Sequence, residues 1–475
     1  MFSYALNSNE VFRIDSNYFQ KQFLREEKVI QEKGSKTLAD LGVELRSFGA
    51  YSLNNAVDYL ESGVPFIRGI NMKKGRVSFT DLIYISEDAH SLLWKSEVKP
   101  EMVLLSMSGT IGEVAIASKK WKYPLNSNQD IAKIDAKGRI NPYFLYTFLL
   151  TKYGQNYLQR EARGSVQQHV FLSQIEQLEI PIVSKKIECE IQYTVEKSDE
   201  ALSIADNLFA QAETLLLDTL GMADFSPSAE VINVKSFKDS FAATGRLDAQ
   251  YYQPKYEQIV NKITAQAHAR LIELVSIQKS IEPGSDAYSD NEDGLPFLRV
   301  ADYSKHGITK PQKCLHAAFV AENRDELEAL KPKKNVILFS KDGSVGEAYC
   351  LREDANFITS GAVLHLAVRD FDEVLPDYLT LALNSKLVKM QAERDAGGSI
   401  ILHWRVGEIE NVVVPLVDMP TQEKIATMVQ ESFSLKAESE RLLDAAKRAV
   451  EIAIEQDEST ALDWLFRNTP DQEAH

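Results

Sequence analysis

Cysteine is scarce in this chain, and long apolar runs are missing from it. The 475 residues include three cysteines, Cys189, Cys314 and Cys350. They lie too far apart for a zinc site or a disulfide framework, so we expect free thiols in a reducing cytoplasm. No apolar run approaches the roughly 20 residues of a membrane span, and the first residues do not resemble a signal peptide. The sequence predicts a protein without a membrane segment.

An excess of positive charge is also missing. The net charge is −16, which argues against tight binding of nucleic acid by the chain as a whole. The acidic residues are concentrated, however. Residues 181–222 carry 3 basic against 8 acidic residues and residues 418–475 carry 6 against 13, whereas residues 1–180 carry 22 against 20. A nucleic-acid role therefore predicts a basic partner.

No complete catalytic constellation is visible. Gly109-x-x-Gly112 is too short for a phosphate-binding loop and lacks its lysine. Asn141-Pro142-Tyr143-Phe144 resembles the catalytic loop of amino-methyltransferases, but the second proline is missing and no Gly-rich cofactor loop precedes it. We expect a helix N-terminus there instead. His169 and His403 have no ligand or triad partners at suitable spacing, which argues against metal and nucleophilic chemistry.

What the sequence does contain is a repeat of a whole unit. Gly109-Thr110-Ile111-Gly112-Glu113 returns 234 residues later as Gly343-Ser344-Val345-Gly346-Glu347. At the same offset, Pro142, Gly164-Ser165, His169 and Pro181 return as Pro376, Gly398-Ser399, His403 and Pro415. Further matches are Arg13 to Phe19 with Arg246 to Tyr252, and Gly63 to Arg68 with Gly294 to Arg299. This period far exceeds that of solenoids, so we expect two similar domains and a ligand with two similar sites.

Each unit contains the same predicted elements. Strands are expected at 64–68 and at 102–107 with its counterpart 336–340, a helix after Pro142 and after Pro376, a Gly-Ser loop, and a closing strand at 178–182 and at 412–416.

A long helix with a heptad-like seam follows each closing strand. The seam positions are Ile187, Ile191, Thr194, Ser198, Ala201, Ala205, Leu208, Ala212 and Leu215 in the first helix, and Ile425, Met428, Ser432, Leu435, Ser439, Leu442, Ala446 and Ala449 in the second. Neither helix buries this stripe alone, so the two are predicted to pack on each other as rods of roughly 50 Å.

Candidate nucleic-acid contacts are polar side chains on predicted turns and loops. In the first unit they are Lys73, Lys74, Arg76, Ser108, Thr110, Asn126, Asn128, Gln129, Arg163, Ser165, Gln167, Gln168 and His169; in the second they are Lys341, Ser344, Ser399, His403 and Arg405. Such donors suit phosphates and base edges, and asparagine or glutamine can pair with adenine. An ordinary solvated turn or loop is the alternative interpretation at each position. At the 234 offset, the amide-rich segment 126–129 faces the unrelated segment 360–363.

The combination resembles the DNA-specificity subunit of type I restriction–modification systems. The resemblance rests on the paired Arg-hydrophobic-Asp-x-x-aromatic-aromatic openings, the Gly-Thr/Ser-hydrophobic-Gly turns, the Gly-Ser loops and the Ile/Val-Pro strands that lead into long helices. Gln422-Glu423-Lys424-Ile425 is similar to the family's helix opening, whereas Glu188-Cys189-Glu190-Ile191 departs from it.

The resemblance implies an α+β fold in which two tandem homologous α/β recognition domains are separated by two long antiparallel coiled-coil-like helices. The predicted division is 1–183 for the first recognition domain, 184–222 for the central spacer helix, 223–417 for the second recognition domain, and 418–475 for the C-terminal helix and tail.

The resemblance also implies function and partners. Each domain would read half of a bipartite double-stranded DNA site, and the helices would bind two methyltransferase subunits. Those subunits, not this chain, would hold S-adenosylmethionine and methylate adenine, and a translocase–nuclease subunit is an optional further partner. Two alternatives remain at this stage: a coiled-coil adaptor that binds only proteins, and an autonomous DNA methyltransferase.

Overall fold

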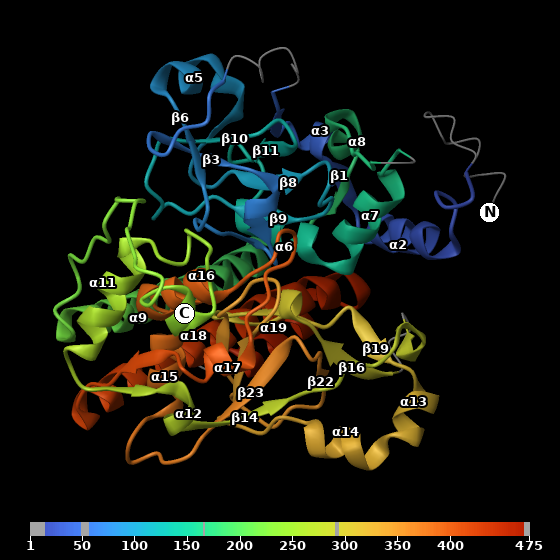
Figure 1. Ribbon diagram of the computed structural model, residues 1–475. Helices are drawn as coiled ribbons and strands as arrows, with labels where there is room; N and C mark the ends of the chain where they lie inside the picture. Colours follow the sequence, from blue (N-terminus) through green and yellow to red (C-terminus); the bar gives the residue numbers. More distant parts are fainter. Residues whose placement is uncertain (1–14, 49–56, 165–166, 290–293, 470–475) are drawn as a thin grey trace. The chain divides into compact units, whose positions relative to one another are not determined.

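The computed structural model describes residues 15–48, 57–164, 167–289 and 294–469, and it divides into two compact units (Figure 1). Unit 1 comprises Met1–Leu202 and Lys436–His475, and unit 2 comprises Ser203–Leu435. Arg13 of the first predicted opening and Ser165 of the first Gly-Ser loop lie outside the described residues. Among the described helices, none combines the length and apolar character that a membrane crossing needs.

The centre of unit 1 is an antiparallel four-stranded sheet. Its strand order is β2 (Glu44–Arg46), β11 (Ile131–Asp135), β8 (Val103–Ser106) and β9 (Val114–Ile116). All residues of β8 and β9 are buried, as expected for strands covered on both faces. The helices that complete this part are α6 (Pro142–Leu150), α7 (Lys152–Glu161), α2 (Lys21–Glu32), α3 (Leu38–Leu41) and α8 (Leu172–Glu176).

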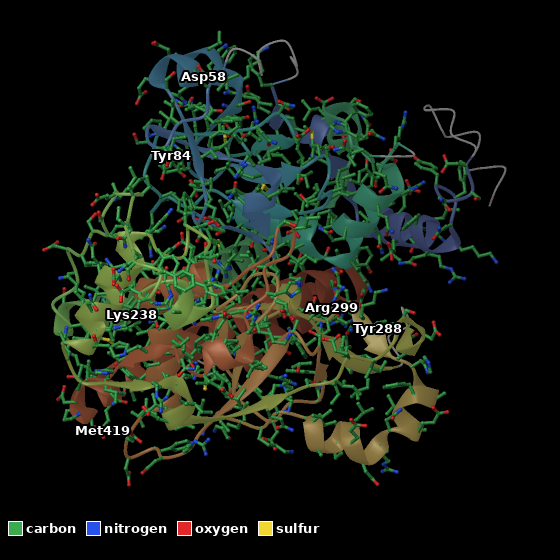
Figure 2. All side chains as sticks on the ribbon, viewed as in Figure 1. Asp58, Tyr84, Lys238, Tyr288, Arg299 and Met419 are labelled. Atoms are coloured by element: carbon green, nitrogen blue, oxygen red, sulfur yellow. The ribbon has the colours of Figure 1, made fainter. Side chains whose placement is uncertain are left out.

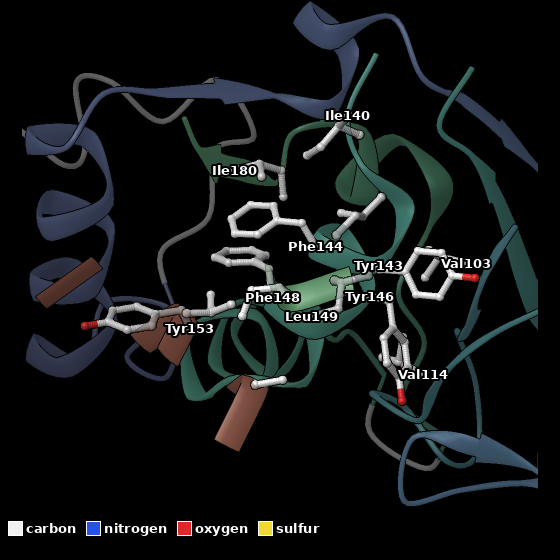
Figure 3. Close-up of a cluster of buried hydrophobic side chains, with 14 of the residues drawn as sticks. Val103, Val114, Ile140, Tyr143, Phe144, Tyr146, Phe148, Leu149, Tyr153 and Ile180 are labelled. Atoms are coloured by element: carbon white, nitrogen blue, oxygen red, sulfur yellow. The ribbon is translucent and has the colours of Figure 1, made fainter. Parts of the chain in front are cut away.

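Helix α6 lies in the core of unit 1. It begins where the sequence predicts: Asn141 Oδ1 accepts the backbone N–H groups of Tyr143 (2.9 Å) and Phe144 (3.2 Å), and Pro142 occupies the first turn. Figure 3 shows the rings of Phe144 and Phe148 on one side of this helix, near Ile180. Seven of its nine residues, Tyr143 to Leu149, are buried, which explains why it is apolar on every face.

A smaller sheet completes unit 1. Its order is β6 (Ile83–Ile85), β3 (Val64–Ile67), β10 (Leu125–Ser127) and β7 (Glu97–Val98), with β3 and β10 parallel. Two further pairs are β1 (Ser35–Thr37) with β12 (Glu179–Pro181), and the hairpin β4 (Met72–Lys73) with β5 (Arg76–Val77). Short helices in the same part are α5 (Glu87–Leu92), η1 (Gly69–Asn71) and η2 (Trp94–Ser96).

Unit 2 repeats this plan. Its main sheet has the order β14 (Val275–Lys279), β23 (Val363–Val368), β20 (Ile337–Ser340) and β21 (Ala348–Cys350), and its small sheet the order β15 (Tyr288–Ser289), β19 (Lys313–Leu315), β16 (Leu295–Leu298) and β22 (Ile358–Thr359). Again one pair of the small sheet, β16 with β22, is parallel. Tyr288, labelled in Figure 2, packs its ring 5.2 Å from that of Phe297.

The remaining elements of unit 2 also have counterparts or fill loops. They are the pair β13 (His268–Arg270) and β24 (Val413–Pro415), the hairpin β17 (Tyr303–Ser304) and β18 (Gly307–Ile308), and the helices α10 (Phe241–Thr244), α11 (Pro254–Thr264), α12 (Leu271–Leu274), α13 (Ala317–Glu322), α14 (Arg324–Leu330), α15 (Pro376–Asn384), α16 (Lys386–Asp395), α17 (Val406–Ile409), η3 (Ser285–Ala287) and η4 (Val300–Asp302). The α+β class with two homologous domains is confirmed.

The two long helices are α9 (Lys185–Thr219) and α18 (Met419–Glu455), and the short α19 (Glu458–Asn468) follows. In unit 1, Ser198 Oγ donates to the Ser439 carbonyl (2.6 Å); in unit 2, Ser432 Oγ donates to the Ala205 carbonyl (2.7 Å). The later α9 residue, Ala205, contacts the earlier α18 residue, Ser432, so the helices are antiparallel. Small seam residues allow this close approach.

Most predicted seam positions are buried, but four in unit 2 are not: Met428 and Leu435 of α18 are half-buried, and α9 has two more. Leu208 and Leu215 are only half-buried, and the adjacent Phe209 and Leu216 take the core positions instead. A heptad pattern allows a one-residue shift of this kind, because the straight helix and the 3.5-residue repeat drift apart by about 20° per heptad.

The structure also corrects one alignment between the repeats. Ser127 of β10 pairs with Ile67, and Thr359 of β22 pairs with Leu298 in the same parallel register. Residues 126–127 therefore correspond to residues 358–359, two positions earlier than the 234 offset implies. They form a buried strand rather than the predicted loop.

Candidate nucleic-acid interface

The segments that contain the Gly-Ser pairs are closed in the same way in both units, at residues that the structure describes. We call residues 163–169 tip loop 1 and residues 397–403 tip loop 2. Arg163 and His169 exchange two backbone hydrogen bonds (2.9 and 2.7 Å), and Gly397 and His403 exchange the equivalent pair (3.0 and 2.7 Å). Each loop is therefore closed at its base by its own backbone.

Both tip loops require glycine at the second position. Gly164 and Gly398 have φ values of 122° and 130°. A Cβ atom would stand 2.2 Å from the Gln167 carbonyl oxygen in the first case and 2.1 Å from the Ile401 oxygen in the second. The glycine of each Gly-Ser pair thus meets a backbone requirement.

Each tip loop is joined to the glycine turn of its own main sheet. Ser108 and Asp342, at the starts of the two turns, form backbone bridges with His169 and His403 respectively. The next residue of each loop is buried: Val170 N–H donates to the Met107 carbonyl (2.9 Å), and Trp404 N–H to the Lys341 carbonyl (2.7 Å). Backbone hydrogen bonds thus join the turn and the loop into one surface in each unit.

Unit 1 presents donors on this surface. Gln167 Nε2 donates to Ser108 Oγ (2.9 Å), and Ser106 Oγ lies 3.1 Å from Thr110 Oγ1. The side chains of Arg163, Gln167 and Gln168 are exposed, and the half-buried His169 ring packs on Phe171. Six of the predicted residues are thus brought together: Ser108, Thr110, Arg163, Gln167, Gln168 and His169.

Unit 2 presents a different set at the same place. His403 Nδ1 and Asp342 Oδ1 are 2.8 Å apart, and Lys341 also pairs with Asp342. Ser344, Ser399 and Arg405 are exposed. Within the described ranges, no three His, Cys, Asp or Glu side chains are placed to hold a metal ion.

The comparisons with known proteins identify the family of the chain. The family model of the type I restriction modification DNA specificity domain matches residues 49–213 and 269–443, which together make up more than half of the chain. The chain belongs to this family. It is a DNA-recognition subunit of the type I restriction–modification class, and it is the non-catalytic specificity subunit rather than the methyltransferase.

Individual relatives are distant. The chain is 24% identical over 365 residues to the type I restriction enzyme MjaIX specificity subunit of Methanocaldococcus jannaschii, covering 74% of this chain and 77% of that protein. It is 22% identical over 422 residues to the EcoBI specificity subunit of Escherichia coli, covering 84% and 78%. The crystal structure of a type I S subunit from M. genitalium superposes with a TM-score of 0.39 at 15% identity, covering 92% of this chain and 96% of that one.

The predicted basic cluster of this specificity subunit lies elsewhere. Arg76 in the β4–β5 hairpin pairs with Asp199 and donates to Ser198 Oγ (2.5 Å) and Ser439 Oγ (2.8 Å). Its guanidinium fastens the hairpin to the two long helices within unit 1 and is not displayed on the outer surface. Lys73 is exposed, and Lys74 is exposed with a weak 4.0 Å ion pair to Glu440.

One of the three predicted amide residues is internal, and the other two are half-buried. Asn126 is fully buried, donates to His90 Nδ1 (3.0 Å) and the Leu93 carbonyl (3.3 Å), and accepts from Ser127 N–H. Asn128 donates to Asp130 (3.2 Å), and Gln129 is half-buried. The structure does not bring Asn126 to the surface, because β10 lies inside the small sheet.

Each unit also holds a buried base that sequence reasoning did not single out. Lys133 Nζ donates to Ser127 Oγ (3.1 Å) and to the Ile131 carbonyl (2.8 Å), and burial lowers its pKa to about 7. His365 Nε2 lies 2.8 Å from Thr359 Oγ1, and burial lowers its pKa to about 4.

The two bases occupy equivalent positions. Lys133 pairs with Leu104 across the sheet and His365 with Leu338, and their hydroxyl partners Ser127 and Thr359 are equivalent as well. A lysine inside an otherwise apolar strand is the signal that could have revealed this site.

Exposed aliphatic residues in tip loop 2 are a second omission. Ile400, Ile401 and Leu402 are exposed, although the sequence around them drew attention only to serine, histidine and arginine. Three consecutive aliphatic residues next to Gly-Gly-Ser are the sequence signal.

Proposed function

We propose that this specificity subunit reads a bipartite double-stranded DNA site, one half with each unit, through the surface formed by a glycine turn and a tip loop. One observation carries this proposal. The two units build the same surface from the same backbone hydrogen bonds, yet display different side chains on it. To recognise two different half-sites, two similar domains need the same backbone surface with different side chains on it.

In unit 1 the proposed contacts are Arg163, Gln167, Gln168, Ser108 and Thr110. Arginine suits phosphates or guanine, and glutamine suits adenine. His169 and Ser165 belong to the same loop in the sequence. The exposed Lys73 and Lys74 are proposed as phosphate contacts, whereas Arg76, Asn126, Asn128 and Gln129 are proposed to position the domain.

In unit 2, Ser399 and Arg405 are proposed as contacts of the same kind, with Ser344 on the glycine turn. Lys341 and His403 are proposed to hold the Asp342 carboxylate, by an ion pair and a hydrogen bond respectively, and so to orient this edge of the loop.

The partners are proposed from the same family. Two methyltransferase subunits would bind the long helices, carry S-adenosylmethionine and methylate adenine, and a restriction subunit would join for cleavage. The acidic segments 181–222 and 418–475, which include these helices, suit basic protein surfaces. The complex is proposed to assemble in the cytoplasm, because its DNA substrate would be the genome. The adaptor and autonomous methyltransferase alternatives are not favoured, because the family is one of DNA-specificity domains.

The test uses the full chain copurified with its methyltransferase. Methylome sequencing of the host with and without this gene first gives the site. Replacing Arg163, Gln167 and Gln168 together by alanine should weaken binding to a duplex with that site by about ten- to a hundredfold. The slope of log K against log salt concentration should become shallower by about one. Gln22→Ala with Arg25→Ala, on the exposed face of α2, is the control and should leave affinity close to wild type.

The result that contradicts the proposal is equally clear. If the triple variant keeps its affinity, its salt dependence and its methylated sequence, tip loop 1 does not contact DNA. Loss of methyltransferase copurification in the triple variant would instead identify a protein contact.

A further inference from the structure

Tip loop 2 exposes three consecutive aliphatic side chains. The exposed fractions are 94% for Ile400, 55% for Ile401 and 41% for Leu402. Isolated apolar residues on a surface are ordinary, but a contiguous exposed run of this kind indicates a contact with another molecule.

The exposure is built into the loop. Gly397 and His403 close its base, and Gly398 adopts a conformation that other residues rarely adopt. The Leu402 carbonyl accepts a hydrogen bond from Gly343 (2.8 Å), and Trp404 is buried directly below, 5.7 Å from the Phe339 ring. The loop is thus held from both the turn and the core, which fixes the aliphatic side chains outside.

Two of these three positions are polar in unit 1, whereas Ile400 corresponds to Val166 in the sequence. Ile401 and Leu402 correspond to Gln167 and Gln168, since both pairs lie between the equivalent glycine and histidine of their loops. One backbone frame therefore carries amides in one unit and aliphatic groups in the other. The groups that each tip recognises should differ in the same way.

We propose that tip loop 2 recognises thymine methyl groups in the major groove of the half-site read by unit 2. The C5-methyl of thymine is the one apolar group on the major-groove edge of the base pairs, and aliphatic side chains discriminate it by burial. This inference rests on the proposed function. DNA is favoured over a protein partner, because the equivalent loop of unit 1 is donor-rich and because exposed Ser399 and Arg405 flank the aliphatic residues with groups suited to phosphate.

The test removes the methyl groups from the DNA. In a duplex carrying the methylated site, each thymine is replaced singly by deoxyuridine, which keeps every hydrogen-bonding group. The half-site of unit 2 is assigned by exchanging residues 223–417 for those of a related subunit. Binding of the full complex should weaken by about fourfold at one or more thymines of this half, the effect of one buried methyl.

The variant Ile400→Ser with Ile401→Ser should bind thymine and deoxyuridine duplexes equally. The control variant Gln167→Ser with Gln168→Ser, at the tip of unit 1, should keep the wild-type discrimination in the half-site of unit 2. Thermal melts confirm that both variants are folded.

Three outcomes overturn the inference. Deoxyuridine has no effect at any thymine of this half; the isoleucine variant still discriminates; or that variant fails to copurify with the methyltransferase while binding DNA normally, which would identify a protein contact. If the wild-type complex does not prefer a duplex with the target sequence found by methylome sequencing over a scrambled duplex, the proposed function itself fails, and the inference with it.

Discussion

The two units share a frame but differ in the chemistry placed on it. The buried base is a lysine on a serine hydroxyl in unit 1 and a histidine on a threonine hydroxyl in unit 2. The sheets keep the same register around both. Either base fills the buried volume and hydrogen-bonds one hydroxyl, so the side chain can differ between the units. The backbone pairing around it cannot differ, because each buried N–H and C=O group needs its partner.

The hairpins that contact the long helices differ in the same way. In unit 1 Arg76 pairs with Asp199 and two serine hydroxyls. In unit 2 the equivalent hairpin uses Lys305, which donates to Glu213 (2.8 Å) and lies 5.3 Å from the Phe209 ring. One hairpin is held by a fork of hydrogen bonds and the other by one ion pair and an aromatic face. Docking of a hairpin on helices therefore does not require one particular chemistry.

The largest expected difference between the units lies below the tip loops. Trp404→Ala should destabilise unit 2 by about 4 kcal/mol, because it empties a fully buried position. Val170→Ala, the equivalent change in unit 1, should cost about 1.5 kcal/mol, since it removes two methyl-sized groups. Hydrogen exchange of β20 and β8 in the full chain measures each unit separately. Equal losses would mean that the two positions are not equivalent supports.

Trp404→Phe is the control for this comparison. Among the described residues, the buried indole N–H finds no hydrogen-bond partner, so phenylalanine keeps most of the volume and removes an unsatisfied donor. Its cost should be below about 1.5 kcal/mol.

Because of their buried bases, the two units should lose stability in different pH ranges. The pKa of Lys133 is about 7 in the folded protein, whereas an unfolded lysine has about 10.4. Between these values the unfolded chain binds more protons, so unit 1 gains stability as pH rises from about 7 to about 10, by up to about 4 kcal/mol. Below about pH 7 the cost of burying the charge is fully present. Lys133→Met should flatten this dependence and stabilise unit 1 at pH 7.

For His365 the window is lower. Its pKa is about 4 when folded and about 6.5 when unfolded, so unit 2 loses stability as pH falls from about 6.5 to about 4, by about 3 kcal/mol. His365→Gln should remove this loss. Urea titrations from pH 4 to 10 on wild type and both variants measure the difference at each pH. An unchanged pH profile in either variant would show that its base is not the titrating group.

The smallest of these expected differences concerns the hairpins. Arg76→Met leaves the partly buried Asp199 carboxylate without its cation and should cost about 2 kcal/mol. Lys305→Met should cost about 0.5 kcal/mol, because its ion pair is more exposed and methionine still packs on Phe209. Urea midpoints of the two variants test this order. Adding Asp199→Asn to Arg76→Met should recover part of the loss, and no recovery would show that the carboxylate is not the origin of the cost.

Some features of the fold follow from sequence alone, because the backbone dictates them locally. Pro142 and Pro376 begin helices, the glycines of the turns and tip loops have positive φ, and alternating small and apolar residues mark the long helices. Such requirements depend on a few neighbouring residues, so their repetition at a nearly constant offset identified two homologous domains and two long helices before any coordinates.

Only the tertiary structure decided what those frames carry. It buried Asn126 in a strand and turned Arg76 toward the helices. It also moved the seam to Phe209 and joined Lys133 to Ser127. Burial and partner choice depend on segments far apart in the chain, so composition and local spacing do not contain them. The aliphatic tip of unit 2 is a further example. The sequence contains the three aliphatic residues, but only the packing of Trp404 and the closed base of the loop show that Ile400 is exposed.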